Sequence, residues 1–268
     1  MSDRTKKIPN IYSKKYVIRY SETGANGRIT CQNLLNYFQD IGSDHAGVLG
    51  ISALDLIQNN MAWVIYEMQL RVFDYPKWDT PFILSTWRYP YRKLYEIRAF
   101  EGKNDDGRIL FSGKCSWVMI HLKNKKPVRL SKHLPETLLN NFVEIDHTFV
   151  SIMPPDTHDC ESDIEVRMHH LDFNQHVNNT IYLQWALENT PMHIQTQLLP
   201  SQVDIRFIGD AHLGDHIKCF GQKINHDPTY IHQITNTEKN TELTLIQTRW
   251  TTFDYGSYFT NYGSGQMN

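Results

Sequence analysis

Apolar and polar residues follow the same order of patterns in each half of the chain. In the first half, an apolar pattern at helical spacing covers 30–41 and is followed by strand patterns at 62–73, 81–88, 92–103 and 108–121. In the second half, a helical pattern covers 178–190 and is followed by strand patterns at 201–210, 216–226, 229–237 and 242–253. A short strand precedes each helix, at 16–20 and 164–168. One helix followed by several antiparallel strands predicts an α+β fold in which the sheet curls around the apolar face of the helix.

The similarity between the halves extends to single positions. When Asn26 is placed over Asn174, Leu35 falls on Leu183 and Tyr37 on Trp185. Further along, after a shorter connection, Asp74 falls on Asp210 and Asp79 on Asp215. A repeat of more than roughly 100 residues is too long for a solenoid unit and indicates duplication of a whole domain.

The stretch between the halves has the composition of a linker, with a short helical pattern and a break at Pro154-Pro155. We therefore expect three parts. They are an N-terminal domain at 1–130, a linker with a short helix at 131–159 and a C-terminal domain at 160–268.

Composition narrows the class of protein. Hydrophobic residues make up 40% of the chain and charged residues 21%, which is typical of a globular protein. The net charge of −2 argues against a dedicated nucleic-acid-binding protein, which would carry a strongly basic face. No apolar run reaches the roughly 18 residues that a membrane-spanning helix needs, so no membrane span is expected.

The compartment is indicated by the N-terminus and the cysteines. The basic N-terminus lacks the apolar core of a secretion signal. The four cysteines are widely separated and form no CxxC pair, which predicts neither a zinc site nor a disulfide framework. Because this usage fits a reducing compartment, we expect a cytoplasmic protein.

Polar side chains gather immediately before the second helix. Asp172, Asn174 and His176 occupy alternate positions, and Asn178 and Asn179 follow at the helix start. Because alternate residues of an extended segment point the same way, we expect the acid, the amide and the imidazole to converge. A helix start offers unpaired N–H groups and a positive dipole end, which suit a developing oxyanion. Asn178 is the expected N-cap.

The first half keeps this scaffold but not its chemistry. Gly24 stands at the position of Asp172 and Arg28 at that of His176, while Asn26 matches Asn174. If the polar residues only capped a helix, both halves would need them equally. The asymmetry favours a functional site in the second half, although turn and cap roles remain the alternative interpretation.

The stretch "LDFNQHVNNTIYLQWALE" resembles the signature of the acyl-ACP thioesterases of plants and bacteria. The first half is similar to that family through "NGRITCQNLLNYFQDIGSDHA", "MAWVIYEMQLRV", "STW" and "LKNKKPVRL". The resemblance implies two tandem hotdog domains, the first of which accommodates the acyl chain. It also implies hydrolysis of a fatty acyl-[acyl-carrier-protein] to the free fatty acid, most like oleoyl-[acyl-carrier-protein] hydrolase. The implied partner is acyl carrier protein, and no cofactor is implied.

The resemblance also implies a fourth catalytic position, a Glu in the strand before a Gly-Asp turn. Counting back from Gly214, that position holds Asp210, whose side chain is one methylene shorter. Plant members have a Cys next, where this chain has Ala211, so we expect direct attack by water. We expect the set Asp172, Asn174, His176 and Asp210 to be catalytic.

Within that set, Asp210 is the expected base or water-positioning group. His176 and Asn174 would orient the water and the thioester carbonyl, and Asp172 would fix the imidazole tautomer. Asp172 as the base is the alternative, because both carboxylates can activate water. A set with a single histidine is a poor transition-metal site, so no metal is expected. The basic stretch at 123–129 is a candidate surface for docking an acidic carrier protein.

Three other functions remain open from the sequence. Hydrolysis of acyl-CoA or an aromatic acyl-CoA needs the same chemistry. A hydratase acting on a thioester would leave the thioester intact, and a lipid-binding module would keep the fold without the activity. The chain is expected to be a monomer or a homodimer, because duplication already pairs the two domains.

Overall fold

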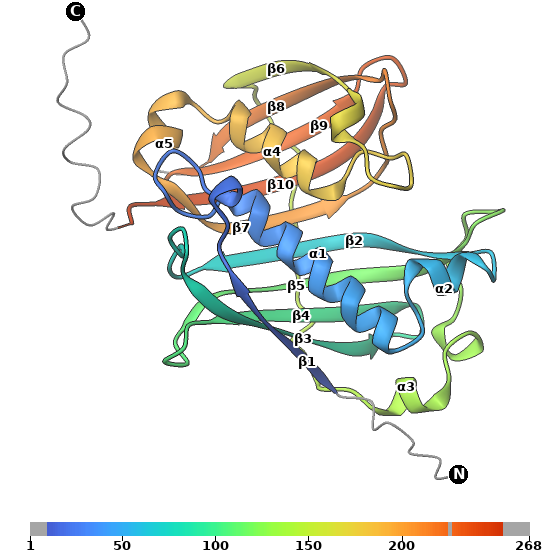
Figure 1. Cartoon of the computed structure of the whole chain (residues 1–268). Helices are drawn as coiled ribbons and strands as arrows, with labels where there is room; N and C mark the ends of the chain where they lie inside the picture. Colours follow the sequence, from blue (N-terminus) through green and yellow to red (C-terminus); the bar gives the residue numbers. More distant parts are fainter. Residues whose placement is uncertain (1–9, 225–226, 254–268) are drawn as a thin grey trace, which may run out of the picture.

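The computed structural model describes residues 10–224 and 227–253, and its ten strands form one antiparallel sheet (Figure 1). The strands of the N-terminal half are β1 (Ile11–Val17), β2 (Met61–Val72), β3 (Pro81–Tyr91), β4 (Tyr95–Lys103) and β5 (Ile109–His121). Those of the C-terminal half are β6 (Cys160–Glu165), β7 (Leu199–Phe207), β8 (His216–Ile224), β9 (Thr229–Asn236) and β10 (Thr241–Thr251). The order across the sheet is β1-β3-β4-β5-β2-β7-β10-β9-β8-β6, so the two halves mirror each other about the β2–β7 pair.

The helices are few and short apart from one in each half. The two main helices are α1 (Cys31–Val48) and α4 (Asn179–Asn189), and they contact each other. The shorter helices are α2 (Ala53–Ile57), α3 (Glu136–Asn140) and α5 (Met192–Gln197), with 3-10 turns at η1 (Tyr20–Glu22), η2 (Leu130–Lys132) and η3 (Met168–His170). In the described part of the chain, no helix is both long and apolar enough to cross a membrane.

Each main helix lies against the sheet of its own half, as the alternating patterns predict (Figure 1). Helix α1 buries Leu34, Leu35, Phe38 and Ile41 completely, with the spacing of one helical face. Its N-cap is Thr30, whose side chain accepts a hydrogen bond from the Asn33 N–H at 3.2 Å. The predicted α+β class and the wrapping of each sheet around a helix are confirmed.

Several element bounds differ from the prediction, among them the short strand before α4, which covers Cys160–Glu165 and not 164–168. The first strand covers Ile11–Val17 and not 16–20, because it pairs with β3 along its full length as an edge strand. Helix α1 continues to Val48, seven residues beyond the predicted end at 41. It continues because Gly42 packs against Arg98 and the buried His45 hydrogen-bonds to the same side chain.

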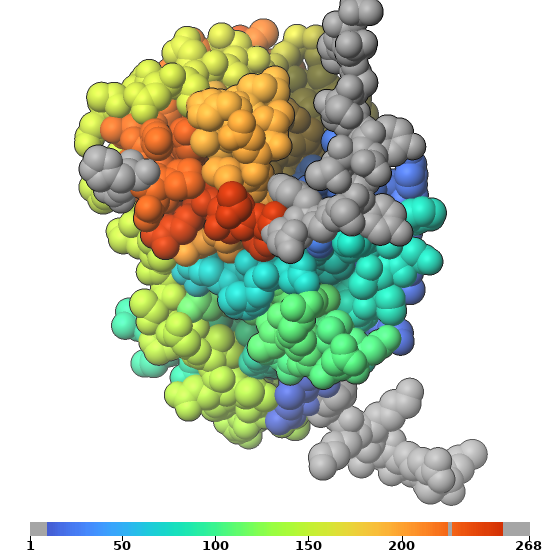
Figure 2. Space-filling view, turned by 90° about the vertical axis from the view of Figure 1, so that its left-hand side faces the viewer, coloured from blue at the N-terminus to red at the C-terminus, as the bar shows by residue number. Residues whose placement is uncertain are grey.

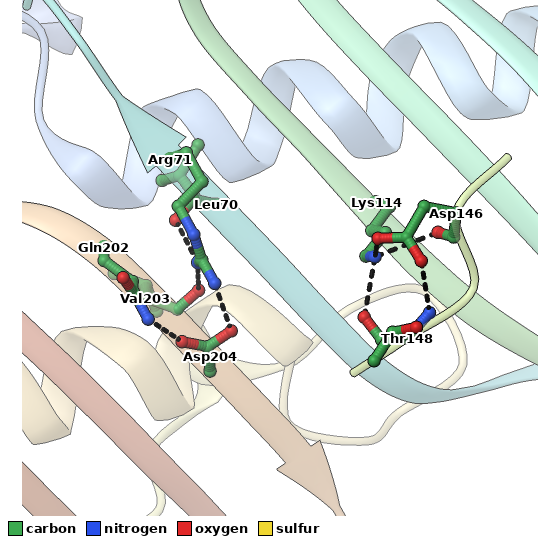
Figure 3. Close-up of polar contacts among 8 residues, drawn as sticks. All are labelled: Leu70, Arg71, Lys114, Asp146, Thr148, Gln202, Val203 and Asp204. Carbon is green, nitrogen blue, oxygen red and sulfur yellow. Dashed lines mark hydrogen bonds and ion pairs between the residues drawn. The ribbon is translucent and has the colours of Figure 1, made fainter. Parts of the chain in front are cut away.

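The segment between α3 and β6 packs on the sheet face opposite the helices. Ile145 lies against Ile97 of β4, and further along Ile152 lies against Ile231 of β9. Lys114 of β5 donates to the Asp146 carboxylate at 2.9 Å and to the Thr148 carbonyl at 2.7 Å (Figure 3). This connection, lime green in Figure 2, therefore lies across both halves of the sheet.

A charged pair spans the junction of the halves. Arg71 of β2 and Asp204 of β7 form an ion pair at 2.9 Å, and Gln202 donates to the second Asp204 oxygen at 2.7 Å (Figure 3). The Asp204 side chain is only 2% exposed. The halves are thus joined by a strand ladder and by an ion pair whose carboxylate is buried.

Candidate active site

The segment before α4 is a tight turn and not the extended segment that alternate spacing predicted. The Asp172 N–H donates to the His176 carbonyl at 2.9 Å, and Leu171 and Val177 form a bridge at its base. Gln175 takes a positive φ of 64°, which closes the turn. The expectation that Asp172, Asn174 and His176 converge along an extended strand was therefore wrong in its geometry.

Asp172 and Asn174 form a local pair inside this turn. The Asp172 carboxylate accepts from the Asn174 backbone N–H at 2.8 Å and from the Asn174 side-chain amide at 3.4 Å. An aspartate that binds the N–H two residues later is an Asx turn. Asp172 therefore holds Asn174 in position.

The N-terminus of α4 is capped as predicted. The Asn178 Oδ1 accepts from the Thr180 N–H at 3.0 Å. The same oxygen accepts from Gln39 of α1 at 3.2 Å. The first half of the chain thus contributes a hydrogen bond directly beside the candidate site.

A backbone contact brings the turn to the loop after β7, which ends at Phe207 and not at the predicted residue 210, so Asp210 lies in this loop. The Val177 N–H donates to the Ala211 carbonyl at 3.0 Å, and the Ala211 N–H donates to the buried Tyr182 hydroxyl at 3.0 Å. Ala211 is fully buried, so its two neighbours in sequence flank it on the exposed side. Those neighbours are Asp210 and His212.

His176 and Asp210 meet at this point. His176 Nδ1 lies 3.1 Å from Asp210 Oδ2, so the two predicted residues lie within hydrogen-bonding distance. The carboxylate in contact with the imidazole is therefore Asp210, whereas Asp172 was expected to fix the tautomer. The side chains are 37% and 56% exposed, which leaves the pair open to solvent.

A second histidine, which the sequence interpretation missed, joins the pair. His212 Nε2 lies 3.9 Å from the same Asp210 oxygen, and the His212 and His176 ring centroids are 4.6 Å apart in an edge-to-face arrangement. One ligand atom from each of the three residues lies within 4.8 Å of the others. The available signal was the alternation of Asp210 and His212 around the apolar Ala211. The expectation of no metal was based on a single histidine, so it omitted this residue.

The turn after His212 is fixed by a carboxylate. The His212 N–H donates to Asp215 Oδ2 at 2.9 Å, and Lys239 pairs with Asp215 at 2.8 Å. Partial burial acts to raise the pKa of Asp215, but Lys239 and the His212 N–H outweigh it and hold that pKa below its ordinary value. Gly214 completes the turn with a φ of 82°, where only glycine is free of strain.

The equivalent positions in the first half carry a different pair. The Gly24–Arg28 turn repeats the fold of the second turn, with Gly27 at a φ of 68°. Arg28 takes the place of His176 and lies 3.4 Å from Asp74, the counterpart of Asp210. The first half thus keeps the geometry and places a permanent cation where the second half has an imidazole.

Family models match most of the chain. The acyl-ACP thioesterase N-terminal domain matches residues 9–138, and the acyl-ACP thioesterase C-terminal domain matches residues 154–252. The palmitoyl-acyl carrier protein thioesterase of Cuphea hookeriana is 29% identical over 71% of this chain and 50% of its own. That of Gossypium hirsutum is 30% identical over 69% of this chain and 48% of its own. The chain thus spans about half the length of the curated relatives it matches.

Solved structures show the same fold. An acyl-ACP thioesterase from Bacteroides thetaiotaomicron superposes with a TM-score of 0.81 at 17% identity, covering 90% of this chain and 98% of that one. The 12:0-ACP thioesterase from Umbellularia californica superposes with a TM-score of 0.80 at 17% identity. The match covers 91% of this chain and 98% of that one. The predicted tandem hotdog fold is confirmed. With both family models matched in order along one chain, the protein belongs to the acyl-ACP thioesterase family.

Proposed function

We propose that the protein hydrolyses the thioester of a fatty acyl-[acyl-carrier-protein], releasing free fatty acid and the holo-carrier and so ending chain extension in fatty acid synthesis. Family membership supports the reaction class. The observation that carries the proposal is the 3.1 Å contact between His176 Nδ1 and Asp210 Oδ2 beside the start of α4.

In this proposal the Asp210–His176 pair acts as the base. A neutral His176 that donates its Nδ1 proton to Asp210 keeps a lone pair on Nε2, and this lone pair takes a proton from the attacking water. Asp210 then stabilises the imidazolium that forms, as a carboxylate partner does in hydrolytic triads. The shorter aspartate is sufficient here, since it already reaches the ring.

Asn174 is the proposed donor to the carbonyl oxygen. One hydrogen of its amide is directed to Asp172 at 3.4 Å, which sets the orientation of the amide plane. The other hydrogen is then available for the oxygen that becomes negative when water adds. Asp172 is in this scheme a positioning residue.

We place the acyl chain in the N-terminal domain and the carrier on its basic surface. The Gln39–Asn178 hydrogen bond brings α1 of the N-terminal domain next to the site, which supports this placement. Lys123, Lys125 and Lys126 are exposed on the turn after β5, where an acidic carrier could bind. The four free cysteines suit a cytoplasmic enzyme.

The test is thiol release from palmitoyl- and oleoyl-carrier protein by His176→Ala and Asp210→Asn. We expect kcat to fall by on the order of 10²–10⁴, since each variant removes the base pair. His216→Ala, an exposed histidine on β8, is the matched control and should retain wild-type turnover. Thermal unfolding checks that each variant is folded.

Wild-type turnover in both site variants would contradict the assignment. Carrier-linked and CoA-linked thioesters compared at equal concentration decide the partner. Thiol release by the wild-type protein also separates a hydrolase from a hydratase, whose product keeps the thioester.

A further inference from the structure

Within residues 10–224 and 227–253, no lysine or arginine forms an ion pair with Asp210 of the C-terminal site. The described ion pairs of Asp210 are both with histidines, His176 and His212. In the first half, the matching Asp74 is paired with two guanidinium groups, Arg28 at 3.4 Å and Arg108 at 2.6 Å. The two duplicated positions thus differ in charge. Asp74 has arginine partners that are always positive, whereas Asp210 has histidine partners.

The surroundings of Asp210 add further negative charge. The carboxylates of Asp172, Asp210 and Asp215 all act electrostatically on the hydroxyl of Tyr182, which lies behind the site. Asp215 is paired with Lys239, whereas Asp172 binds the neutral Asn174. A mobile cation is therefore attracted to the place that Arg28 occupies in the other half.

The geometry is close to that of a divalent metal site. A tetrahedral zinc ion lies about 2.0–2.2 Å from each nitrogen or oxygen ligand, which places the ligand atoms about 3.4 Å apart. The two distances to Asp210 Oδ2 are 3.1 Å from His176 Nδ1 and 3.9 Å from His212 Nε2, on either side of that value. All three ligand atoms lie within 4.8 Å of one another, so rotation of the side chains would bring them around one ion.

The position of the three ligands is fixed by the backbone around them. Val177 and Ala211 are hydrogen-bonded, which holds the His176 turn against the Asp210–His212 segment. The His212 N–H is bound to Asp215, so the backbone that carries the second imidazole is also held. Because all three side chains are more than a third exposed, an ion can enter and keep water in its remaining positions.

We infer that His176, Asp210 and His212 form a binding site for a divalent transition-metal ion, with zinc as the probe, and that the bound ion inhibits hydrolysis. Two imidazoles and one carboxylate with open positions are a ligand set that suits such ions. The inhibition rests on the proposed function, because the ion would occupy the atoms that act as the base. The binding itself does not depend on that function.

Binding is tested with the full chain and Co²⁺ or Zn²⁺ alone. We expect one equivalent of Co²⁺ to produce visible d–d absorption that Zn²⁺ displaces, and Zn²⁺ binding to be measurable by calorimetry. His212→Ala and His212→Gln should weaken binding by on the order of tenfold or more. His216→Ala keeps the same histidine count as these variants and should bind as the wild type does. Equal affinity in all four proteins would overturn the site.

Inhibition is tested on the same proteins with acyl-carrier substrate. The turnover of each protein with added Zn²⁺ is compared with the turnover of the same protein in the presence of a chelator. Added Zn²⁺ should inhibit the wild type and His216→Ala at concentrations that leave His212→Ala active. Unchanged or increased turnover with bound Zn²⁺ would overturn the inhibitory role. If the protein has no hydrolase activity, the proposed function fails while the absorption and calorimetry still decide the metal site.

Discussion

His232 on β9 is a titratable group enclosed by the fold. It is 0% exposed, and its Nε2 lies 3.5 Å from the Thr248 hydroxyl. Burial lowers the pKa of His232 to about 3, so the ring is neutral in the folded protein. In the unfolded chain a histidine has a pKa of about 6.5. Below pH about 6.5 the unfolded state binds a proton that the folded state does not. The contribution of His232 to stability is therefore fully present above pH about 6.5 and declines as the pH falls toward about 3.

We expect His232→Leu to remove this part of the acid sensitivity. Between pH about 6 and about 4, the free energy of unfolding should fall with decreasing pH in both proteins. The slope of the wild type should exceed that of His232→Leu by about 1.4 kcal/mol per pH unit. Urea unfolding of both proteins at a series of pH values measures the difference in slope. The exposed His216→Ala should retain the wild-type slope. Parallel curves for wild type and His232→Leu would show that the histidine is not the linked group.

The packing of α1 on its sheet depends on a glycine in β5. A Cβ on Gly113 would lie 2.3 Å from the Phe38 ring and 2.5 Å from the Gln69 carbonyl oxygen. The Phe38 ring in turn stacks on Phe100 at 4.3 Å between centroids. Gly113 is therefore required by the close approach of helix and strand and not by a turn.

Gly113→Ala should reduce the free energy of unfolding by about 1–3 kcal/mol, because the ring and a backbone oxygen must both move. Gly47→Ala in α1, the helix that packs on Gly113, is the matched control, since nothing lies within 4 Å of the added Cβ. That control should be stabilising by up to about 1 kcal/mol through helix propensity. Chemical unfolding measures both, and a neutral Gly113→Ala would contradict the close packing.

Most of the strands could be predicted from alternation alone, and their bounds agree within a few residues. The end of α1 could not, because Gly42, which directly follows the predicted end, has a low intrinsic helix propensity. The helical conformation of Gly42 and His45 depends on Arg98 of β4, a contact that no local pattern contains.

The site was predictable where the two halves could be compared. Asp172 and His176 stood out against Gly24 and Arg28. His212 was missed because its importance depends on the hydrogen bond between residues 177 and 211, which joins positions far apart in sequence. The same hydrogen bond places Asp210, and not Asp172, beside the His176 imidazole.

The junction of β2 with β7 makes one sheet from two domains. Figure 2 shows the C-terminal half directly against the cyan β2 region of the N-terminal half. Strand pairing runs from Glu67 to Arg71 on one side and from Gln202 to Arg206 on the other. The Arg71–Asp204 pair lies within this ladder, with one oxygen of Asp204 held by each half.

Asp204→Ala should therefore reduce the free energy of unfolding by about 3 kcal/mol, since it leaves Arg71 without its buried partner. Asp105→Ala is the matched control, because the Lys15–Asp105 pair has both side chains more than half exposed. An exposed pair contributes about 0–1 kcal/mol, so this control should unfold almost as the wild type does. Equal losses in the two variants would argue against a special role for the junction.

The hydrogen bond from Gln39 to Asn178 joins two helix regions that are encoded in different halves of one chain. In an assembly of two identical subunits, every substitution appears twice and alters both ends alike. Here a single polypeptide encodes each end separately, so Arg28 and His176 can stand at equivalent places without conflict. The two ends of one polypeptide can therefore differ in sequence, and the C-terminal end carries an imidazole where the N-terminal end carries a guanidinium group.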